Sequence, residues 1–323
     1  THFKSQGNFH PTEGKLRPVH VLHRGEISQQ RGFASPGMLP LGQGLSWKID
    51  TATTEGERRA TLAHWLTDER HPLVWRSIVN RMWQYHFGRG IVRSSNNFGF
   101  LGEEPTHPEL LNWLASELIS GGWKLKRIHK LIMMSKTYQM DSKGNEPALA
   151  KDPNNDYFWR YDMRRLSAEE IRDSILNLSG KLNLKMGGPS IYTEVPREVL
   201  ATSSRPGGAW GNSSEEDRNR RSVYIYVKRS LHEPFLSAFD WADTDNTCDV
   251  RFVTTVPTQT LTLLNSKFLN DSAETLAKYV ENKTPNDIRA QVSHALYNAT
   301  NRKPSEIDIQ DGLDLIKDLK EKS

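Results

Sequence analysis

The sequence has almost no cysteine and no long apolar run. Cys248 is the only cysteine among the 323 residues, which excludes an intrachain disulfide, a cysteine-based zinc site and covalent attachment of a c-type haem. The longest apolar stretches are only a few residues, such as residues 131–134, whereas a membrane-spanning helix needs about 18. We therefore expect no membrane span and no cofactor held through thiols.

The sequence also has little excess of either positive or negative charge. The 43 Lys and Arg residues exceed the 39 Asp and Glu residues by only four, which is too small an excess to predict a nucleic-acid partner. The sequence has no nucleophile elbow, phosphate-binding loop, dinucleotide fingerprint or HExxH motif. It begins with Thr1 and lacks a signal-peptide pattern, so we expect it to be part of a longer protein whose export signal lies outside it.

What is present predicts a mainly α fold, with a bundle-like helical body, long ordered loops and a few short strands. We expect an irregular N-terminal arm over residues 1–55 and a helical domain over 56–323. A possible sub-boundary lies near 144–155, where the composition becomes polar and rich in turn residues, and a long glycine-rich loop covers 186–221. Residues 222–229 form the best strand candidate because Val, Ile and Tyr are dense there.

Two sequence patterns predict how helices begin. Thr106 with Glu109, and Ser167 with Glu170, have the spacing of a capping box, in which a hydroxyl and a carboxylate satisfy each other's free backbone amides. Both positions are therefore predicted helix starts.

Three residues are candidate catalytic groups. His86 ends a helical apolar stripe, so it could be a base, a metal ligand or an axial ligand to a partner's haem, or simply a packed histidine. His107 beside Glu109 resembles an acid–base or metal pair, although Glu109 already has a capping role. Asp240 belongs to an acidic segment that lacks the glycine and glutamate of a calcium-binding loop, so we predict no metal there.

A separate set of residues suits an anionic ligand. The guanidinium group binds carboxylate, sulfate or phosphate through paired hydrogen bonds, and Arg81, Arg164 and Arg165 belong to a larger group with Arg89, Arg93 and Arg160. The alternative is that nearby aspartates pair with these arginines internally. Trp210 lies in a glycine-rich loop, where its indole could stack on a sugar ring or anchor its own loop.

Several ordered segments of the sequence resemble one family. The segments are Asn80 to Gly90, Asn97-Phe98-Gly99, Gly102 to Leu111, Asp152-Pro153-Asn154, Trp159-Arg160, Arg164 to Glu169, Arg172-Asp173, Phe239-Asp240, Gln259 to Asn265 and the opening Leu22 to Gly25. Together they resemble the planctomycete cytochrome-associated PSD family, a domain of unknown function numbered 1553. The segment after Asp240 lacks the proline usual in the family, and Thr260 replaces a small residue.

The resemblance implies a setting and no chemistry. Family members are typically the C-terminal part of exported multidomain proteins, so an extracytoplasmic location and a companion upstream domain or chain are expected. Haem c is expected on that preceding domain, and no cofactor within this chain. Members are often encoded among sulfatases and other polysaccharide-processing proteins, and no catalytic residues carry over from the family.

We therefore consider three functions. The first is a module that binds, or helps to process oxidatively, an anionic sulfated polysaccharide, with Arg81, Arg164, Arg165 and Trp210 contacting the glycan. The second is a polysaccharide hydrolase or lyase that uses His86, His107 or Asp240, with or without a metal. The third is a non-catalytic structural or assembly domain.

Overall fold

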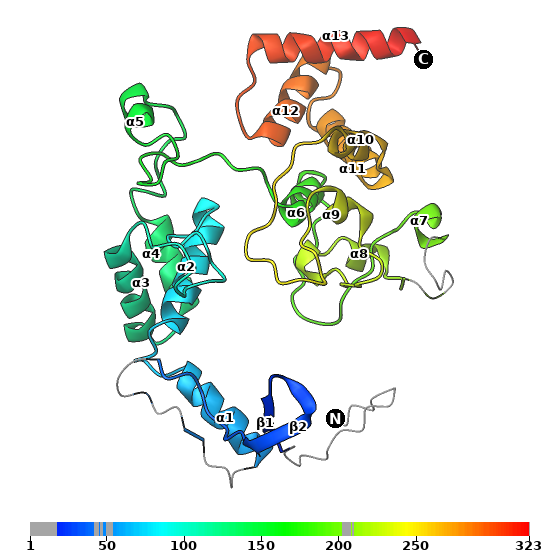
Figure 1. Cartoon of the computed structure of the whole chain (residues 1–323). Coiled ribbons are helices and arrows are strands. Elements are labelled where there is room, and N and C mark those ends of the chain that lie inside the picture. Colours follow the sequence, from blue (N-terminus) through cyan, green and yellow to red (C-terminus); the bar gives the residue numbers. More distant parts are fainter. Residues whose placement is uncertain are drawn as a thin grey trace. The chain divides into compact units, whose positions relative to one another are not determined.

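A computed structural model shows the architecture of the chain (Figure 1). It describes residues 18–41, 45, 48–49, 54–201, 208 and 210–322. Within these residues there are thirteen α-helices and a single pair of strands, so the predicted mainly α fold is confirmed. The chain divides into two compact units, unit 1 (Thr1–Met163) and unit 2 (Arg164–Ser323).

Unit 1 is built on three helices that pack against one another. Its elements are β1 (His20–His23), β2 (Glu26–Phe33), α1 (Glu55–Leu66), α2 (Val74–Phe87), α3 (Pro108–Ser120), α4 (Leu125–Met133) and α5 (Glu146–Lys151). Helix α2 contacts both α3 and α4, and α3 contacts α4. The apolar side of α2, with Trp75, Val79 and Trp83, is buried in this core, because residues three and four apart share a helix face. Gly88 ends α2 in a left-handed conformation with φ of 80°.

The start of α3 differs from the prediction. The helix begins at Pro108, its N-cap is His107, and no side chain caps it. Proline suits the first helical position because it has no amide hydrogen to satisfy there, and it moves the start away from Thr106. The Thr106 amide and hydroxyl instead donate to the Ile91 carbonyl at 3.0 and 3.4 Å. The predicted capping box of Thr106 and Glu109 is therefore wrong.

A hairpin lies in the segment that we predicted to be irregular. Strands β1 and β2 pair antiparallel, with His23 opposite Glu26. Arg24 and Gly25 between them both have positive φ, 48° and 79°, which is the geometry of a two-residue hairpin turn. The expectation of irregular structure is therefore wrong for residues 20–33, while residues 1–17 of the predicted arm lie outside the described residues.

Unit 2 combines short and long helices, and its apolar core is smaller than that of unit 1. Its elements are α6 (Ala168–Leu178), α7 (Arg197–Ala201), α8 (Glu215–Arg218), the 3-10 helix η2 (Ser222–Tyr224), α9 (Pro234–Ala238), α10 (Pro257–Asn265), α11 (Lys267–Lys283), α12 (Ile288–Thr300) and α13 (Glu306–Lys322). The predicted capping box at α6 is confirmed, because Ser167 and Glu170 each accept the other's backbone amide. Buried residues from α6 and α9 meet Ile191 and Ile225 in the core.

The predicted strand over residues 222–229 is wrong. Its first residues form η2 because the Ser222 amide and hydroxyl both donate to Asp173, at 2.8 and 2.7 Å. Only Ile225 then forms an isolated bridge, with Ile191, and no extended partner continues the pairing. The long loop predicted over 186–221 contains the short helices α7 and α8, and residues 202–207 and 209 within it are outside the described residues.

Of the helices in the described ranges, none combines the length and the apolar character that crossing a membrane requires.

Candidate functional site

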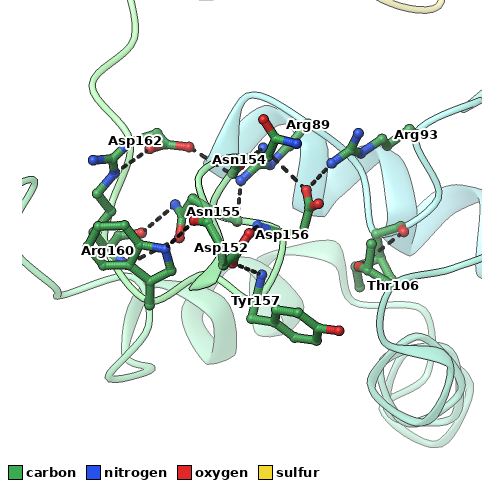
Figure 2. Close-up of polar contacts among 12 residues, drawn as sticks. Arg89, Arg93, Thr106, Asp152, Asn154, Asn155, Asp156, Tyr157, Arg160 and Asp162 are labelled. Atoms are coloured by element: carbon green, nitrogen blue, oxygen red, sulfur yellow. Dashed lines mark hydrogen bonds and ion pairs between the residues drawn. The ribbon is translucent and has the colours of Figure 1, made fainter. Parts of the chain in front are cut away.

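Three of the arginines predicted to bind an anion belong to an internal network of unit 1 (Figure 2). Arg89 follows α2 and donates to the Asn154 carbonyl at 2.6 Å and to Asp162 at 3.3 Å. Asp162 also accepts from Arg160 at 3.0 Å. Arg93 pairs with Asp156, which lies 3.8 Å from Arg89 as well. These arginines therefore hold the loop over residues 152–162 against the end of α2.

The same loop is fixed from within by buried polar groups. The two carboxylate oxygens of Asp152 accept the backbone amides of Asp156 and Tyr157 at 2.8 and 2.9 Å. Asn155 is buried, has a φ of 54° and donates from its side chain to the Arg160 carbonyl at 2.9 Å. Asparagine tolerates this left-handed conformation better than most residues. The network thus has a structural role, because it holds the loop over residues 152–162 in place.

The arginines predicted as ligand contacts have protein partners in two different units. Arg81 in unit 1 donates to the side-chain oxygen of Asn96. In unit 2, Arg164 binds both carboxylate oxygens of Glu170 at 2.7 and 2.8 Å. Arg165 donates to Asp240 at 2.6 Å. Arg164 and Arg165 therefore engage different partners, and their contact with a ligand stays a prediction.

The pairing of Arg164 strengthens the helix start that it adjoins. Hydrogen bonds from Arg164 lower the pKa of Glu170 to about 2, and the Ser167 backbone amide adds to this effect against the opposing effect of burial. Glu170 therefore stays ionised as the capping acid of α6 over the physiological range.

The three candidate catalytic residues have separate surroundings. His86 Nε2 lies 2.8 Å from His129 Nδ1, and burial together with the charge of His129 lowers the pKa of His86. His107 Nδ1 lies 2.9 Å from the Thr106 hydroxyl. Both histidines belong to unit 1, whereas Asp240 belongs to unit 2. The role of these three residues as acids or bases stays a prediction.

Asp240 is held as an anion. Burial alone would raise its pKa, but hydrogen bonds from the Thr254 amide and hydroxyl, together with Arg165, outweigh burial and lower the pKa of Asp240. Asp240 also has a φ of 60°, so the residue fixes a sharp turn in the chain. Its carboxylate accepts hydrogen bonds and has no proton to donate near neutral pH.

Trp210 lies against its own unit. Its indole Nε1 donates to the Thr193 carbonyl at 2.9 Å, and its ring meets the Tyr192 ring edge-on at a centroid distance of 5.5 Å. The indole thus anchors its own segment, as one of the two alternatives had it, and stacking of Trp210 on a sugar stays a prediction. The hydrogen bond also places Trp210 beside Thr193, a residue of a cavity that the sequence did not predict.

This cavity of unit 2 has a volume of about 750 Å³. Its lining comes from α6, α8, α10, α11 and the segments around Thr193 and Glu233. Basic side chains are frequent in the lining: Arg172, Lys181, Arg197, Arg218 and Lys267. The acidic ones are Glu194, Glu215, Glu233 and Asp271. Phe235 and Phe268 add apolar ring surface.

The most deeply buried charged residue of the lining is Arg172. Its exposed fraction is 4%, because it shares a face of α6 with the buried Ala168 and Leu176. Its guanidinium donates to the carbonyls of Arg218 and Arg220 at 2.5 and 3.1 Å, and to the Ser222 hydroxyl at 3.2 Å. Burial lowers the pKa of Arg172 from its ordinary value, although nearby carboxylates oppose this. Arg172 therefore brings a fixed positive charge to the cavity wall.

Glu233 is the buried acid of the same cavity, with an exposed fraction of 5%. It is the N-cap of α9, and its Oε2 accepts the Leu236 amide at 2.6 Å. Its other oxygen lies 3.4 Å from the Thr193 hydroxyl, which donates to it. Burial raises the pKa of Glu233, and the Leu236 amide and the charge of Arg172 oppose the effect without cancelling it. The raised pKa means that Glu233 takes up a proton more readily than an exposed glutamate does.

The sequence carried a signal for one of these two residues. Arg172 interrupts the buried stripe of α6 at the spacing of Ala168 and Leu176, and an arginine at a core position of a helix indicates a buried polar site. Glu233 precedes Pro234 at the start of a short helix, which in a sequence looks like an ordinary helix cap. Its burial depends on contacts between segments distant in sequence, so no local pattern indicates it.

No three His, Cys, Asp or Glu side chains group closely enough to hold a metal ion among the described parts of the chain.

The architecture and the lining define a mainly helical chain whose second unit has a polar cavity lined by five basic and four acidic residues. Residues 58–316 match the profile of a family described as PSD1, protein of unknown function (DUF1553), so the chain belongs to that family. No curated protein matches the chain. No solved structure matches it either.

Proposed function

We propose that the chain is an extracytoplasmic module that binds an anionic polysaccharide, including sulfated ones, and that the cavity of unit 2 takes up the charged part of the glycan. The observation that carries this proposal is a cavity of about 750 Å³ whose lining holds five basic side chains, one of which is the buried Arg172. Clefts of roughly 300–1,000 Å³ are the usual size for small-ligand sites. The volume therefore suits a short saccharide segment.

The chemistry of the lining supports an anionic sugar. Guanidinium and ammonium groups form strong charge-assisted hydrogen bonds with sulfate and carboxylate. The rings of Phe235 and Phe268 provide apolar surface for the non-polar face of a sugar. Trp210 adjoins the cavity through Thr193, which supports its proposed contact with the glycan. Arg81 in unit 1, and Arg164 and Arg165 in unit 2, stay proposed contacts of the glycan outside this cavity.

The likeness to a planctomycete cytochrome-associated family supports the wider setting. In this setting the module acts beside a companion upstream domain or chain outside the cytoplasm, and haem c on that companion supplies any electron transfer. The residues of this chain would then bind and orient the polysaccharide, and oxidative processing would take place through the companion.

The binding proposal is tested by isothermal titration of the purified chain with dextran sulfate and with neutral dextran of the same length. We expect measurable binding of the sulfated polymer only. The Lys267→Ala variant should weaken binding about fivefold to tenfold, because one charge-assisted contact is worth roughly 1–1.4 kcal/mol. Equal heats from the two polymers would contradict the proposal.

A matched control lies on the same helix. Lys278 resembles Lys267 in exposure, 67% against 69%, and in pairing, since each binds a carboxylate four residues away at 2.6 Å. Lys278 is not part of the cavity lining. We expect Lys278→Ala to leave binding unchanged, and an equal loss in both variants would mean that unspecific surface charge causes the binding. One variant at Arg81 and another at Arg164 and Arg165 together test the proposed contacts outside the cavity, one unit at a time.

A second candidate function is cleavage of the polysaccharide by hydrolysis or elimination. The burial of Glu233 in the cavity wall favours it, because catalytic acids near neutral pH are carboxyl groups with raised pKa. Incubation of the chain with sulfated and uronate-rich polysaccharides, followed by chromatography of the products, tests it. Shorter products that the Glu233→Gln variant fails to form would support cleavage, and unchanged polymer would contradict it.

A further inference from the structure

The cavity contains one acid whose position differs from that of the other three. Glu194 and Asp271 are largely exposed and pair with basic residues of the same cavity: Glu194 with Arg218 at 3.6 Å and Asp271 with Lys267 at 2.6 Å. Glu215 is exposed as well. Glu233 alone among these carboxyl groups is 5% exposed. An ionised group at such a site pays a desolvation cost that an exposed one avoids.

Arg172, the basic residue of the lining that is buried as deeply as Glu233, is held in place by other contacts. Arg172 uses its guanidinium for two backbone carbonyls and the Ser222 hydroxyl, and Asp173 beside it accepts from Ser222 and lies 3.8 Å from Arg172. Arg172 therefore attracts the Glu233 carboxylate through space but is held in place by the backbone. This attraction is the part of the environment that favours ionisation of Glu233.

The two carboxylate oxygens of Glu233 have different hydrogen-bond partners. Oε2 accepts the Leu236 amide at 2.6 Å and caps α9, whereas Oε1 has the weaker contact with Thr193 at 3.4 Å. Helix α10, which also contacts α9, carries no charged residue. The other charged groups around the cavity are Lys181, Glu194, Arg197, Glu215, Arg218, Lys267 and Asp271. Because Glu233 lines the cavity and Oε1 has only a long hydrogen bond, Oε1 is the oxygen that a ligand would engage.

Resting on the proposed function, we infer that the Glu233 carboxyl group carries a proton when the cavity holds an anionic saccharide and donates it in a hydrogen bond to a sulfate or carboxylate oxygen of that ligand. An ionised Glu233 would repel the same oxygen in a poorly hydrated site. The neutral acid adds a donor beside the charge of Arg172. Anion binding is therefore coupled to protonation of one named residue.

The test is titration of the chain with dextran sulfate at about pH 5 and about pH 8, in pairs of buffers with different ionisation enthalpies. We expect uptake of up to about one proton per occupied site, and at least tenfold weaker binding at the higher pH, because the proton must then be taken from solution. Glu233→Gln should bind the polymer without proton uptake at this site, because the amide group is neutral at every pH. Its side-chain oxygen can still accept the Leu236 amide.

The control variant is Glu194→Gln, which removes an exposed carboxylate from the same cavity. It should keep the proton uptake of the original chain. If Glu194→Gln abolished the uptake and Glu233→Gln kept it, the inference would be overturned. The inference would also be overturned if the original chain bound the polymer with no proton uptake and equal affinity at both pH values.

A ligand-free measurement separates this inference from the binding proposal and does not depend on a variant. The ¹³C resonance of the Glu233 carboxyl group, followed against pH in the original chain, should titrate above the ordinary range of glutamate. If dextran sulfate fails to bind while Glu233 titrates in this raised range, the proposed function is wrong, but the raised pKa of Glu233 is confirmed. If Glu233 titrates at or below the ordinary value, the inference fails whether or not the polymer binds.

Discussion

The two units place their charged residues differently. In unit 1 the core is apolar and rich in aromatic rings. Three arginines of this unit, Arg89, Arg93 and Arg160, lie outside the core and pair with aspartates of one loop (Figure 2). In unit 2 two arginines, Arg172 and Arg220, are themselves buried, with exposed fractions of 4% and 2%. The charged side chains of unit 1 hold a loop in place, whereas Arg172 and Arg220 of unit 2 are buried inside the fold.

This difference supports unit 2 as the place of the proposed binding site. An arginine whose donors are taken up by carboxylates at a loop has little to offer an anion. A buried arginine tied to carbonyls keeps its full positive charge, because a carbonyl does not neutralise it. Unit 2 therefore has a buried cation at a cavity wall, with the carboxyl groups of Asp173 and Glu233 nearby.

The largest expected effect tests the apolar core of unit 1. Replacing Leu114, which is 1% exposed, by alanine should lower the free energy of unfolding by about 3 kcal/mol, because burial is lost and a cavity remains. Urea unfolding followed by circular dichroism measures this. Leu101→Ala is the control, since Leu101 is 95% exposed and should change stability little. Similar losses in both variants would contradict the assigned core.

A smaller loss is expected from the buried charge of unit 2. The Arg172→Met variant removes the donors of the Arg218 and Arg220 carbonyls, and each unsatisfied buried group costs roughly 1–3 kcal/mol. We expect a net loss of about 2 kcal/mol in urea unfolding, because methionine refills part of the volume. Arg229→Met is the control, as Arg229 is 75% exposed. Unchanged stability of Arg172→Met would mean that these hydrogen bonds do not support unit 2.

The ion pairs of unit 1 should contribute less. Asp156→Asn removes the carboxylate that Arg93 binds, and both side chains are about one-third exposed, 38% and 33%. We expect a loss of about 1 kcal/mol that shrinks in added salt, because solvent and ions screen partly exposed pairs. Thermal unfolding at low and high salt measures it. Asp141→Asn, at a pair with a 64% exposed carboxylate, should have no effect, and a salt-independent loss at Asp156 would point to packing instead.

The smallest expected effect is the pH response of His86. Burial and the charge of His129 lower the pKa of His86 in the folded chain, so as pH falls through about 6.5 the unfolded chain takes up the proton first. The free energy of unfolding therefore decreases as pH falls through this range, by less than about 1 kcal/mol, and levels off below the folded pKa. Urea unfolding between about pH 8 and 5, with His86→Gln for comparison, measures the difference. Identical pH slopes would contradict it.

Local signals predicted the helices well where one residue type decides the geometry. The apolar stripe of α2 followed from helical spacing, and the capping box at Ser167 followed from two side chains three apart. The prediction at Thr106 failed because Pro108 competes for the helix start. The strand predicted after Ser222 failed because β structure needs a partner, and only Ile191 provides one.

The candidate site could be predicted from the sequence less well than the helices. Residue type identified the arginines as anion ligands in general, but whether a guanidinium binds an internal carboxylate depends on contacts across many positions, such as Arg89 with Asp162. The cavity and Glu233 depend on how segments from residue 172 to residue 272 surround one space. Only Arg172 has a local sequence signal, because it occupies a core position of an amphipathic helix.

Gly90 and Asn80 give unit 1 a pair of positions that cannot change independently. The side chain of Asn80 is fully buried and binds both the amide and the carbonyl of Val92, at 2.8 and 2.9 Å. A methyl group at Gly90 would lie 2.6 Å from the Asn80 amide nitrogen and 2.5 Å from the Val92 oxygen. In a library that randomises both codons, single replacements at Gly90 should be lost, and any surviving clone should carry a smaller residue at position 80, with a rebuilt turn as the compensating change.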